Sequence, residues 1–233
     1  MGEPRPKFPE DDESEKEIPP EEEDEEGEEF DDTGPFSHYE EPGFSDVGDD
    51  DDDAGFADYA RAVKEFCAVL KRGDLDEAKK LQVVNNFFNQ IPFISDAIHW
   101  KQQDYWATPL ELLGSNGGDC EDYSIAKYLT LRELGVADGK LRITYVKALK
   151  LNEAHMVLTY YSSPSAEPVI LDNLEGDILP ASQRKDLLPV YSFNGESLWL
   201  NSGLSDVGQL VGGSERIAPW RDLLRRMSLE TVT

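Results

Sequence analysis

The sequence contains only two cysteines, Cys67 and Cys120, which stand 53 positions apart among 233 residues. Two cysteines are too few for a disulfide-stabilised scaffold. Cys67 lies on the apolar face of a predicted helix, so we expect it to be a buried structural thiol. Cys120 is therefore the cysteine to consider for chemistry.

Long hydrophobic runs are also missing. No stretch of the sequence has the roughly 20 apolar residues that a membrane-spanning helix needs. The first seven residues, Met-Gly-Glu-Pro-Arg-Pro-Lys, lack the apolar segment of a secretory signal peptide. We therefore expect no membrane insertion, and no signal peptide within this sequence.

Basic residues are scarce: 22 Lys and Arg stand against 49 Asp and Glu, for a net charge of −27. This charge argues against nucleic acid as a ligand or substrate. Residues 1–53 hold 25 acidic and three basic residues, a net charge of −22, which leaves −5 for residues 54–233. We expect an acidic disordered tail over 1–53 and a folded domain over 54–233.

The role of the acidic tail stays open. Its composition is typical of a solvated, solubilising segment. It could also bind cations or mimic a polyanion. Its scattered aromatic residues could form a docking peptide.

The hydrophobic pattern of the domain changes from a helical period to a period of two near Gly135. Helices are predicted first, at 56–72, 75–90 and 120–134, with a loop-rich stretch over 92–116. Strands are predicted at 141–149, 155–161 and 169–174, with one or two more in 187–200 and a final helix at 216–228. This order predicts an α+β fold, with N-terminal helices packed on an antiparallel sheet.

Cys120 follows Gly-Gly-Asp at the predicted start of a helix. With Asp119 as the N-cap, Cys120 begins the first turn, where the helix dipole lowers a thiol pKa and backbone N–H groups can stabilise an oxyanion. The carboxylates of Asp119, Glu121 and Asp122 oppose this effect, so a cation is expected to offset them. The alternative is a buried structural cysteine, for which the acidic neighbours are a poor setting.

His155 and Asp172 are candidate partners for the thiol. His155 opens a predicted strand, which would hold its imidazole rigidly for general-base chemistry, although spacing alone favours a core or surface histidine. Asp172 ends the strand Val-Ile-Leu and could orient that imidazole. Asn173 could do the same, or the Asp-Asn pair could simply begin a turn before Gly176.

Six segments carry a resemblance to a known family. They are Asp-Tyr-Trp-Ala-Thr-Pro (104–109), Gly-Asp-Cys-Glu-Asp-Tyr (118–123), Ala-Lys-Tyr-Leu-Thr-Leu-Arg (126–132), Leu-Arg-Ile-Thr-Tyr-Val-Lys-Ala-Leu (141–149), Ala-His-Met-Val-Leu (154–158) and Leu-Asp-Asn-Leu (171–174). In this order they resemble the bacterial transglutaminase-like cysteine proteinases, in particular the LapG-type periplasmic proteases. The resemblance runs from about residue 57 to 230.

The resemblance implies a papain/transglutaminase-like fold and a Cys–His–Asp triad. Cys120 would be the nucleophile, His155 the base and then the acid, and Asp172 the orienting carboxylate. The family is periplasmic and cleaves the N-terminal region of a large cell-surface adhesin at a small-residue, Ala-Ala-containing motif, which promotes biofilm dispersal. It requires Ca²⁺ and is inhibited by the periplasmic domain of an inner-membrane cyclic-di-GMP receptor.

A calcium requirement agrees with the acidic setting of the thiol. Asp119, Glu121 and Asp122 supply hard oxygen ligands beside Cys120, without the spacing of an EF-hand. Asp104 is a further candidate ligand. Nearby Trp106 could wall a narrow substrate groove or help to form the oxyanion hole, or it could be a core aromatic residue.

Three other functions remain open. The same triad could pass its acyl group to an amine, as in a transglutaminase, because both reactions share the acyl-enzyme. The domain could be a calcium-dependent binding module with a vestigial triad. The protein could also act mainly as an acidic interaction protein.

Overall fold

The computed structural model describes residues 75–230. The tail over 1–53, the helix predicted at 56–72 and Cys67 lie outside the described residues. Their structure, and the domain boundary placed at residue 54, stay predictions. Among residues 75–230, no helix is both long and apolar enough to cross a membrane.

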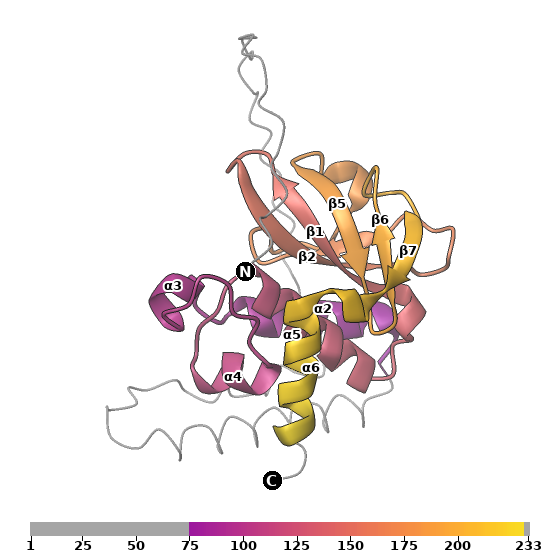
Figure 1. The fold of residues 1–233 in the computed structure, drawn as a ribbon. Coiled ribbons are helices and arrows are strands. Elements are labelled where there is room, and N and C mark those ends of the chain that lie inside the picture. The colour runs from indigo at the N-terminus through magenta and orange to yellow at the C-terminus, as the bar shows by residue number, and fades with distance from the viewer. Residues whose placement is uncertain (1–74, 231–233) are drawn as a thin grey trace, which may run out of the picture. The chain divides into compact units, whose positions relative to one another are not determined.

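The described chain consists of a helical group followed by one antiparallel sheet (Figure 1). The α-helices are α2 (Glu77–Asn89), α3 (Asp96–His99), α4 (Pro109–Gly114), α5 (Cys120–Glu133) and α6 (Ala218–Glu230). The strands are β1 (Leu141–Ala148), β2 (Glu153–Tyr160), β3 (Val169–Leu171), β4 (Leu179–Pro180), β5 (Leu187–Phe193), β6 (Ser197–Leu200) and β7 (Gln209–Gly213). Single 3₁₀ turns are η1 (Asp138–Lys140), η2 (Ala181–Gln183) and η3 (Ser214–Arg216). The strand order is β4-β3-β2-β1-β5-β6-β7.

Helix α2 forms because its sequence supplies both a cap and an apolar face. The Asp76 carboxylate accepts a hydrogen bond from the Lys79 backbone N–H at 2.8 Å, which satisfies one of the free N–H groups at the helix start. Leu81, Val84 and Phe88 recur at helical spacing and are buried. This face packs against α5.

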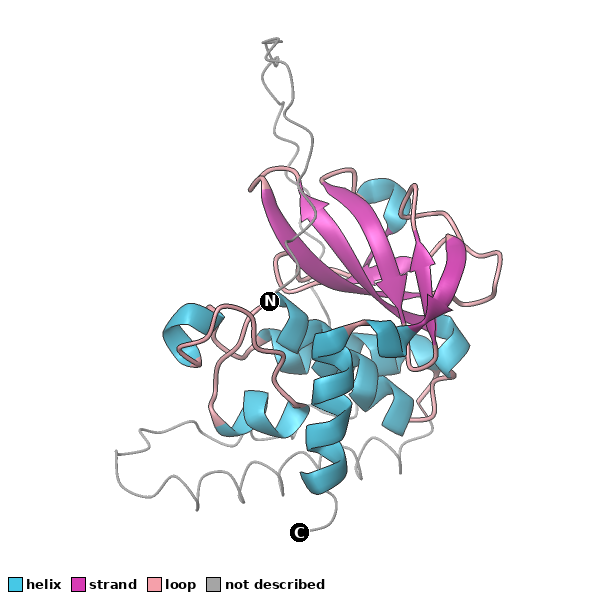
Figure 2. Cartoon of the chain, in the orientation of Figure 1, coloured by secondary structure: helices cyan, strands magenta, loops and turns pink. Residues whose placement is uncertain are grey.

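Helix α5 packs against α2, α4 and strands β1 and β2, and the α-helices gather on one side of the sheet (Figure 2). Helix α5 is buried along most of its length because it contacts elements on several sides. Its buried residues are Asp122, Tyr123, Ser124, Ile125, Ala126, Lys127, Tyr128, Thr130 and Leu131. A helix enclosed in this way has a fixed axis, so the residue at its N-terminus has a fixed position.

Strand β2 separates two hydrophobic clusters. Met156 and Leu158 belong to the main core that also contains α5, whereas Val157 belongs to a smaller cluster with Ile170 and Leu187. This alternation follows from the period of two along a strand. The β1–β2 register pairs Val146 with His155. Strand β3 pairs with the C-terminal half of β2, at residues 158–160.

The predicted α+β fold, with helices packed on an antiparallel sheet, is confirmed. The predicted strand at 169–174 is shorter, because β3 ends at Leu171 before the chain turns. The loop-rich assignment of 92–116 was wrong in part, because this stretch contains α3 and α4. Strands β4 and β7 were not predicted, since β4 has only two residues and β7 ends in two glycines.

Candidate active site and metal centre

The loop before α5 places Cys120 at the first position of the helix, as the Gly-Gly-Asp sequence predicts. The Asp122 carboxylate accepts a hydrogen bond from the Asp119 backbone N–H at 3.1 Å, which ties the N-cap residue to the first turn. Gly118 lies against the same carboxylate, and a Cβ at this position would be only 2.6 Å from Asp122 Oδ2. The glycine is therefore needed for close packing at the helix start.

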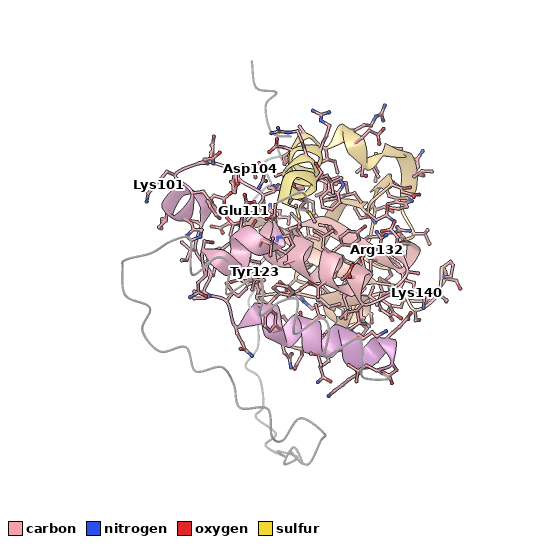
Figure 3. The ribbon with its side chains drawn as sticks, turned by 90° about the horizontal axis from the view of Figure 1, so that it is seen from below. Lys101, Asp104, Glu111, Tyr123, Arg132 and Lys140 are labelled. Atoms are coloured by element: carbon pink, nitrogen blue, oxygen red, sulfur yellow. The ribbon has the colours of Figure 1, made fainter. Side chains whose placement is uncertain are left out.

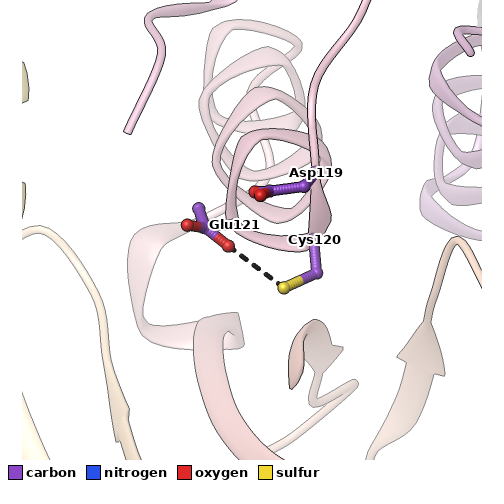
Figure 4. A group of neighbouring side chains, drawn as sticks. All are labelled: Asp119, Cys120 and Glu121. Carbon is purple, nitrogen blue, oxygen red and sulfur yellow. Dashed lines mark hydrogen bonds between the residues drawn. The ribbon is translucent and has the colours of Figure 1, made fainter. Parts of the chain in front are cut away.

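The Cys120 thiol is half-buried and points toward Glu121, with its Sγ 3.0 Å from Glu121 Oε2 (Figure 4). Burial raises the pKa of this thiol well above its ordinary value, and the charges of Glu121 and Asp119 raise it further. A hydrogen bond from the Met156 backbone N–H opposes this shift. Burial, and after it the neighbouring carboxylates, therefore favours the protonated thiol in the absence of a cation.

His155 and Asp172 are brought together by the pairing of β2 with β3. His155 is 4% exposed, and its Nε2 lies 2.7 Å from Asp172 Oδ1. An ionised carboxylate can only accept, so Nε2 carries the proton and Nδ1 is the ring nitrogen that can act as a base. Asp172, rather than Asn173, is therefore the residue that contacts the imidazole.

Asp172 is 1% exposed, and several hydrogen-bond donors take the place of water around its carboxylate. Oδ1 also accepts from the Leu174 backbone N–H at 3.0 Å, and Oδ2 accepts from Arg184 Nη2 at 2.7 Å. Burial alone would raise the pKa of Asp172, but the hydrogen bonds from His155, Leu174 and Arg184 lower it to about 2. Asp172 is therefore ionised at any pH near neutrality.

The main chain at Asp172 is anchored to the helices. Its carbonyl oxygen accepts from Asn89 Nδ2 at 2.8 Å and from Lys127 Nζ at 3.1 Å. Lys127 also donates to Asn89 Oδ1 at 2.7 Å, and burial lowers the pKa of this amine to about 7. These contacts link the Asp172 segment to α2 and to the helix that begins with Cys120.

Helix α5 is also joined directly to the strand of His155. The Ser124 hydroxyl lies 2.9 Å from the carbonyl oxygen of Cys120 and 2.9 Å from that of Met156, and it can donate to either. One side chain thus connects the residue at the helix start with the residue that follows His155.

Carboxylates gather close to Cys120, around the start of α5. Three groups of residues each offer potential ligand atoms that lie within 4.8 Å of one another. They are Asp119, Cys120 and Glu121; Asp96, Asp104 and Glu121; and Asp96, Asp119 and Asp122. All four predicted metal ligands therefore belong to this cluster. Asp96 at the start of α3 was missed, because its 23-residue separation from Asp119 gives no spacing signal.

Burial and mutual repulsion disfavour the ionised form of the carboxylates in this cluster. Burial raises the pKa of Asp96 to about 6, and it raises the pKa of Glu121 to about 9 with help from Asp119. The pKa of Asp119 is raised in the same way. In the view of Figure 3, Asp104 lies away from Arg132 and Lys140, and Lys101 is the labelled cation on its side of the domain. A bound cation would lower all the shifted values.

The oxygen atoms of the cluster fit a calcium ion. Asp96 Oδ1 and Asp119 Oδ1 are buried and have no hydrogen-bond donor among the described residues. Both Asp122 oxygens already accept from backbone N–H groups, those of Ala107 and Asp119. Asp122 thus supports the loop, and the carboxylates of Asp96, Asp119, Glu121 and Asp104 are better placed to supply hard ligands.

Trp106 is 6% exposed, and its ring stacks on Phe193 with centroids 5.8 Å apart. Its Nε1 donates to Asp104 Oδ1 at 3.1 Å. The structure thus favours the core role over the wall of a groove. Through its indole N–H, Trp106 also fixes a candidate metal ligand.

Comparison with known families shows one clear relationship. The sequence model described as "Bacterial transglutaminase-like cysteine proteinase BTLCP" matches residues 51–193. No curated protein sequence matches the chain.

Solved structures of LapG from Legionella pneumophila are similar to the chain. One is 43% identical over 74% of this chain and 88% of its own, with a TM-score of 0.65. An EGTA-treated form is 43% identical, covers 74% of this chain and 89% of its own, and has a TM-score of 0.65. A calcium-bound form is 42% identical, covers 74% of this chain and 91% of its own, and has a TM-score of 0.64.

Proposed function

Because the chain belongs to the bacterial transglutaminase-like cysteine proteinases, we propose that it is a calcium-dependent endopeptidase that uses Cys120, His155 and Asp172. The buried hydrogen bond between His155 and Asp172 carries this proposal. It leaves Nδ1 of His155 to act on a thiol whose sulfur accepts from the backbone N–H of the next residue, Met156.

The proposed reaction begins when the Cys120 thiol turns from Glu121 toward His155. Nδ1 takes the thiol proton, Sγ attacks the peptide carbonyl carbon, and the imidazolium then protonates the leaving amine. Water hydrolyses the thioester with His155 acting again as base. Ionised Asp172 stabilises the imidazolium, and first-turn N–H groups of α5, which lack intrahelical acceptors, would stabilise the oxyanion.

Calcium would be held by Asp96, Asp104, Asp119 and Glu121, with Asp122 supporting the loop. When bound, it supplies positive charge beside a thiol that is otherwise surrounded by carboxylates. The calcium-bound and EGTA-treated forms of Legionella LapG support the choice of this ion.

We propose further that the substrate is a large cell-surface adhesin, cleaved in its N-terminal region at an Ala-Ala motif, with release of the adhesin and biofilm dispersal as the result. The site of action would be the periplasm, and the inhibitor would be the periplasmic domain of an inner-membrane cyclic-di-GMP receptor. The resemblance of six segments to LapG-type proteases and the 43% identity to Legionella LapG support this assignment. If the purified receptor domain leaves cleavage unchanged, this partner is wrong.

The test is incubation of the purified chain with an adhesin N-terminal fragment, with calcium or excess EGTA. Wild type should cut the fragment only with calcium, and Cys120→Ala should not cut it. A fragment with the Ala-Ala motif replaced by Leu-Leu is the control substrate. Full cleavage in EGTA would refute the calcium requirement.

The same assay separates hydrolysis from acyl transfer. An added primary amine should not appear in the product mass of a protease. Amine incorporation as the main product would instead identify a transglutaminase.

A further inference from the structure

We propose that Arg184 is a positioning residue for the same reaction, a buried cation that fixes the Asp172 carboxylate in the orientation that holds His155. This inference rests on the proposed function, because the reaction it serves is the one proposed for Cys120.

The two oxygens of Asp172 have different partners. Oδ1 faces His155 Nε2 and Oδ2 faces Arg184 Nη2, each at 2.7 Å. Rotation of the carboxylate would break both contacts at once. Because Arg184 is 3% exposed, water cannot easily replace its hydrogen bonds. The guanidinium on Oδ2, together with the Leu174 backbone N–H on Oδ1, therefore determines which way the carboxylate faces.

The guanidinium is itself held in place. Asp186 accepts from Arg184 Nε at 3.1 Å and from Nη2 at 3.0 Å, a two-point contact that fixes the plane of the group. The Arg184 backbone N–H donates to the Ala181 carbonyl at 3.1 Å, in the turn that precedes β5. The chain Asp186–Arg184–Asp172–His155 thus runs from the start of β5 to the imidazole.

Charge gives Arg184 a second effect. A buried carboxylate that loses a hydrogen-bonded cation takes up a proton more readily. A protonated Asp172 could no longer stabilise an imidazolium at His155. The hydrogen bond from Arg184 is thus one of those that lower the pKa of Asp172, after those from His155 and Leu174. A purely structural ion pair would affect stability but not the pH profile of the reaction.

The test uses the full chain with Arg184→Met and Arg184→Lys. Arg142→Met is the matched control, because Arg142 is also buried but lies on the rings of Tyr161 and Trp199. We expect Arg184→Met to lower kcat/KM at least tenfold at neutral pH and to move the acid limb of its pH profile up by about one unit. Arg184→Lys should restore part of the loss, since it keeps the charge but not the two-point geometry. Arg142→Met should keep the shape of the profile.

A second measurement does not depend on cleavage. The chain has three histidines, so ¹⁵N-labelled histidine gives few imidazole signals by NMR. In wild type the His155 proton should sit on Nε2, and Arg184→Met should change both this signal and the titration of His155. The inference is overturned if Arg184→Met lowers only the melting temperature, with the titration and pH profile unchanged.

Two further outcomes separate the positioning role of Arg184 from the proposed function. If wild type cleaves no substrate but Arg184→Met still shifts the His155 titration, the proposed function fails and the positioning role stands. If Arg184→Met does not fold, Arg184→Lys decides. A His155 titration in Arg184→Lys that differs from that of wild type supports the positioning role, and an unchanged titration overturns it.

Discussion

At the scale of single residues, the informative contacts join positions that are far apart in sequence. Asp96 reaches the acidic cluster from α3, and its Oδ2 accepts from the Tyr105 backbone N–H. Its Oδ1 is buried without a donor among residues 75–230. An oxygen in this state is costly to bury unless a cation contacts it. Asp96 is therefore expected to contribute directly to calcium affinity.

Asp96→Asn tests this role, because asparagine keeps an oxygen that can accept from Tyr105 but removes the charge. We expect the calcium Kd, measured by titration calorimetry, to rise at least tenfold, which corresponds to about 1.4 kcal/mol. Asp177→Asn, at an exposed position outside the cluster, is the control and should bind calcium as wild type does. An unchanged Kd in Asp96→Asn would remove this residue from the ligand set.

Sequence patterns could predict site residues only where the cause is local. The position of Cys120 follows from Gly118 and Asp119 beside it, which terminate one segment and cap the next. Asp96 and Arg184 act through contacts with residues 23 and 12 positions away, across a loop and a turn. No periodicity places such residues, since their proximity results from the packing of the helices and the sheet.

At the scale of elements, α5 is the part that assembles the site. It carries Cys120 at its first position and Lys127 seven residues later, on the same side of the helix. Ser124 between them contacts the strand of His155, and Lys127 contacts the segment of Asp172. A shift of α5 would therefore move Cys120 relative to both His155 and Asp172.

Gly118→Ala should disturb the start of this helix. The added Cβ would lie 2.6 Å from both Asp122 Oδ2 and Leu112 Cδ1, so the capping carboxylate or the α4 packing has to move. We expect a loss of about 1–3 kcal/mol in the free energy of unfolding, measured by urea denaturation, together with slower cleavage.

Gly139→Ala is the matched control, since a Cβ there would meet no described residue within 4 Å apart from its chain neighbours. It should change stability by less than about 0.5 kcal/mol. Equal effects of the two substitutions would contradict the packing argument at Gly118.

Elements with strong local signals could be predicted, and the others could not. The strands predicted at 141–149 and 155–161 agree with β1 and β2 to within two residues at each end, because their hydrophobic residues repeat clearly. Helix α4 has a local signal, the capping box of Thr108 and Glu111 with Pro109 at its first position, but it lies in a stretch rich in loops. Among the strands of residues 75–230, β7 pairs only with β6, and its sequence has no alternating pattern.

At the scale of the whole molecule, the proposed calcium site would link the binding of this ion to stability through its buried carboxylates. Without calcium, the folded state keeps protons on Asp96 up to pH about 6 and on Glu121 up to about 9, whereas the unfolded chain releases them near their ordinary values of 3.8 and 4.5. Folded pKa values raised in this way favour folding at low pH, and the benefit is lost as pH rises. Above pH 7, Lys127 acts in the opposite direction, since its pKa is lowered to about 7.

We therefore expect the melting temperature in chelator to fall between pH 5 and pH 7, by an amount that corresponds to roughly 4 kcal/mol. Calcium at 100 times its Kd should add about 2.7 kcal/mol at a given pH. Differential scanning calorimetry in matched buffers measures both effects. A melting temperature in chelator that rises from pH 5 to pH 7 would contradict the account of the cluster.

The α+β class could be predicted because the change from helical to strand periodicity is a property of the whole chain. The charge separation between residues 1–53 and the rest is also visible in the sequence, and its structural meaning stays a prediction. The order of strands in the sheet could not be predicted, since β1 pairs with both β2 and the distant β5.

The loop between β2 and β3 gives the fold a practical property. It joins the strand of His155 to that of Asp172, yet Ser162–Ser165 are exposed and the two site residues are held by strand pairing and by α5. Loop length adds little to the free energy of closing such a connection. A peptide tag or fluorescent reporter inserted between Pro164 and Ser165 would therefore lie between His155 and Asp172 in sequence. It would leave the distance between these two side chains unchanged.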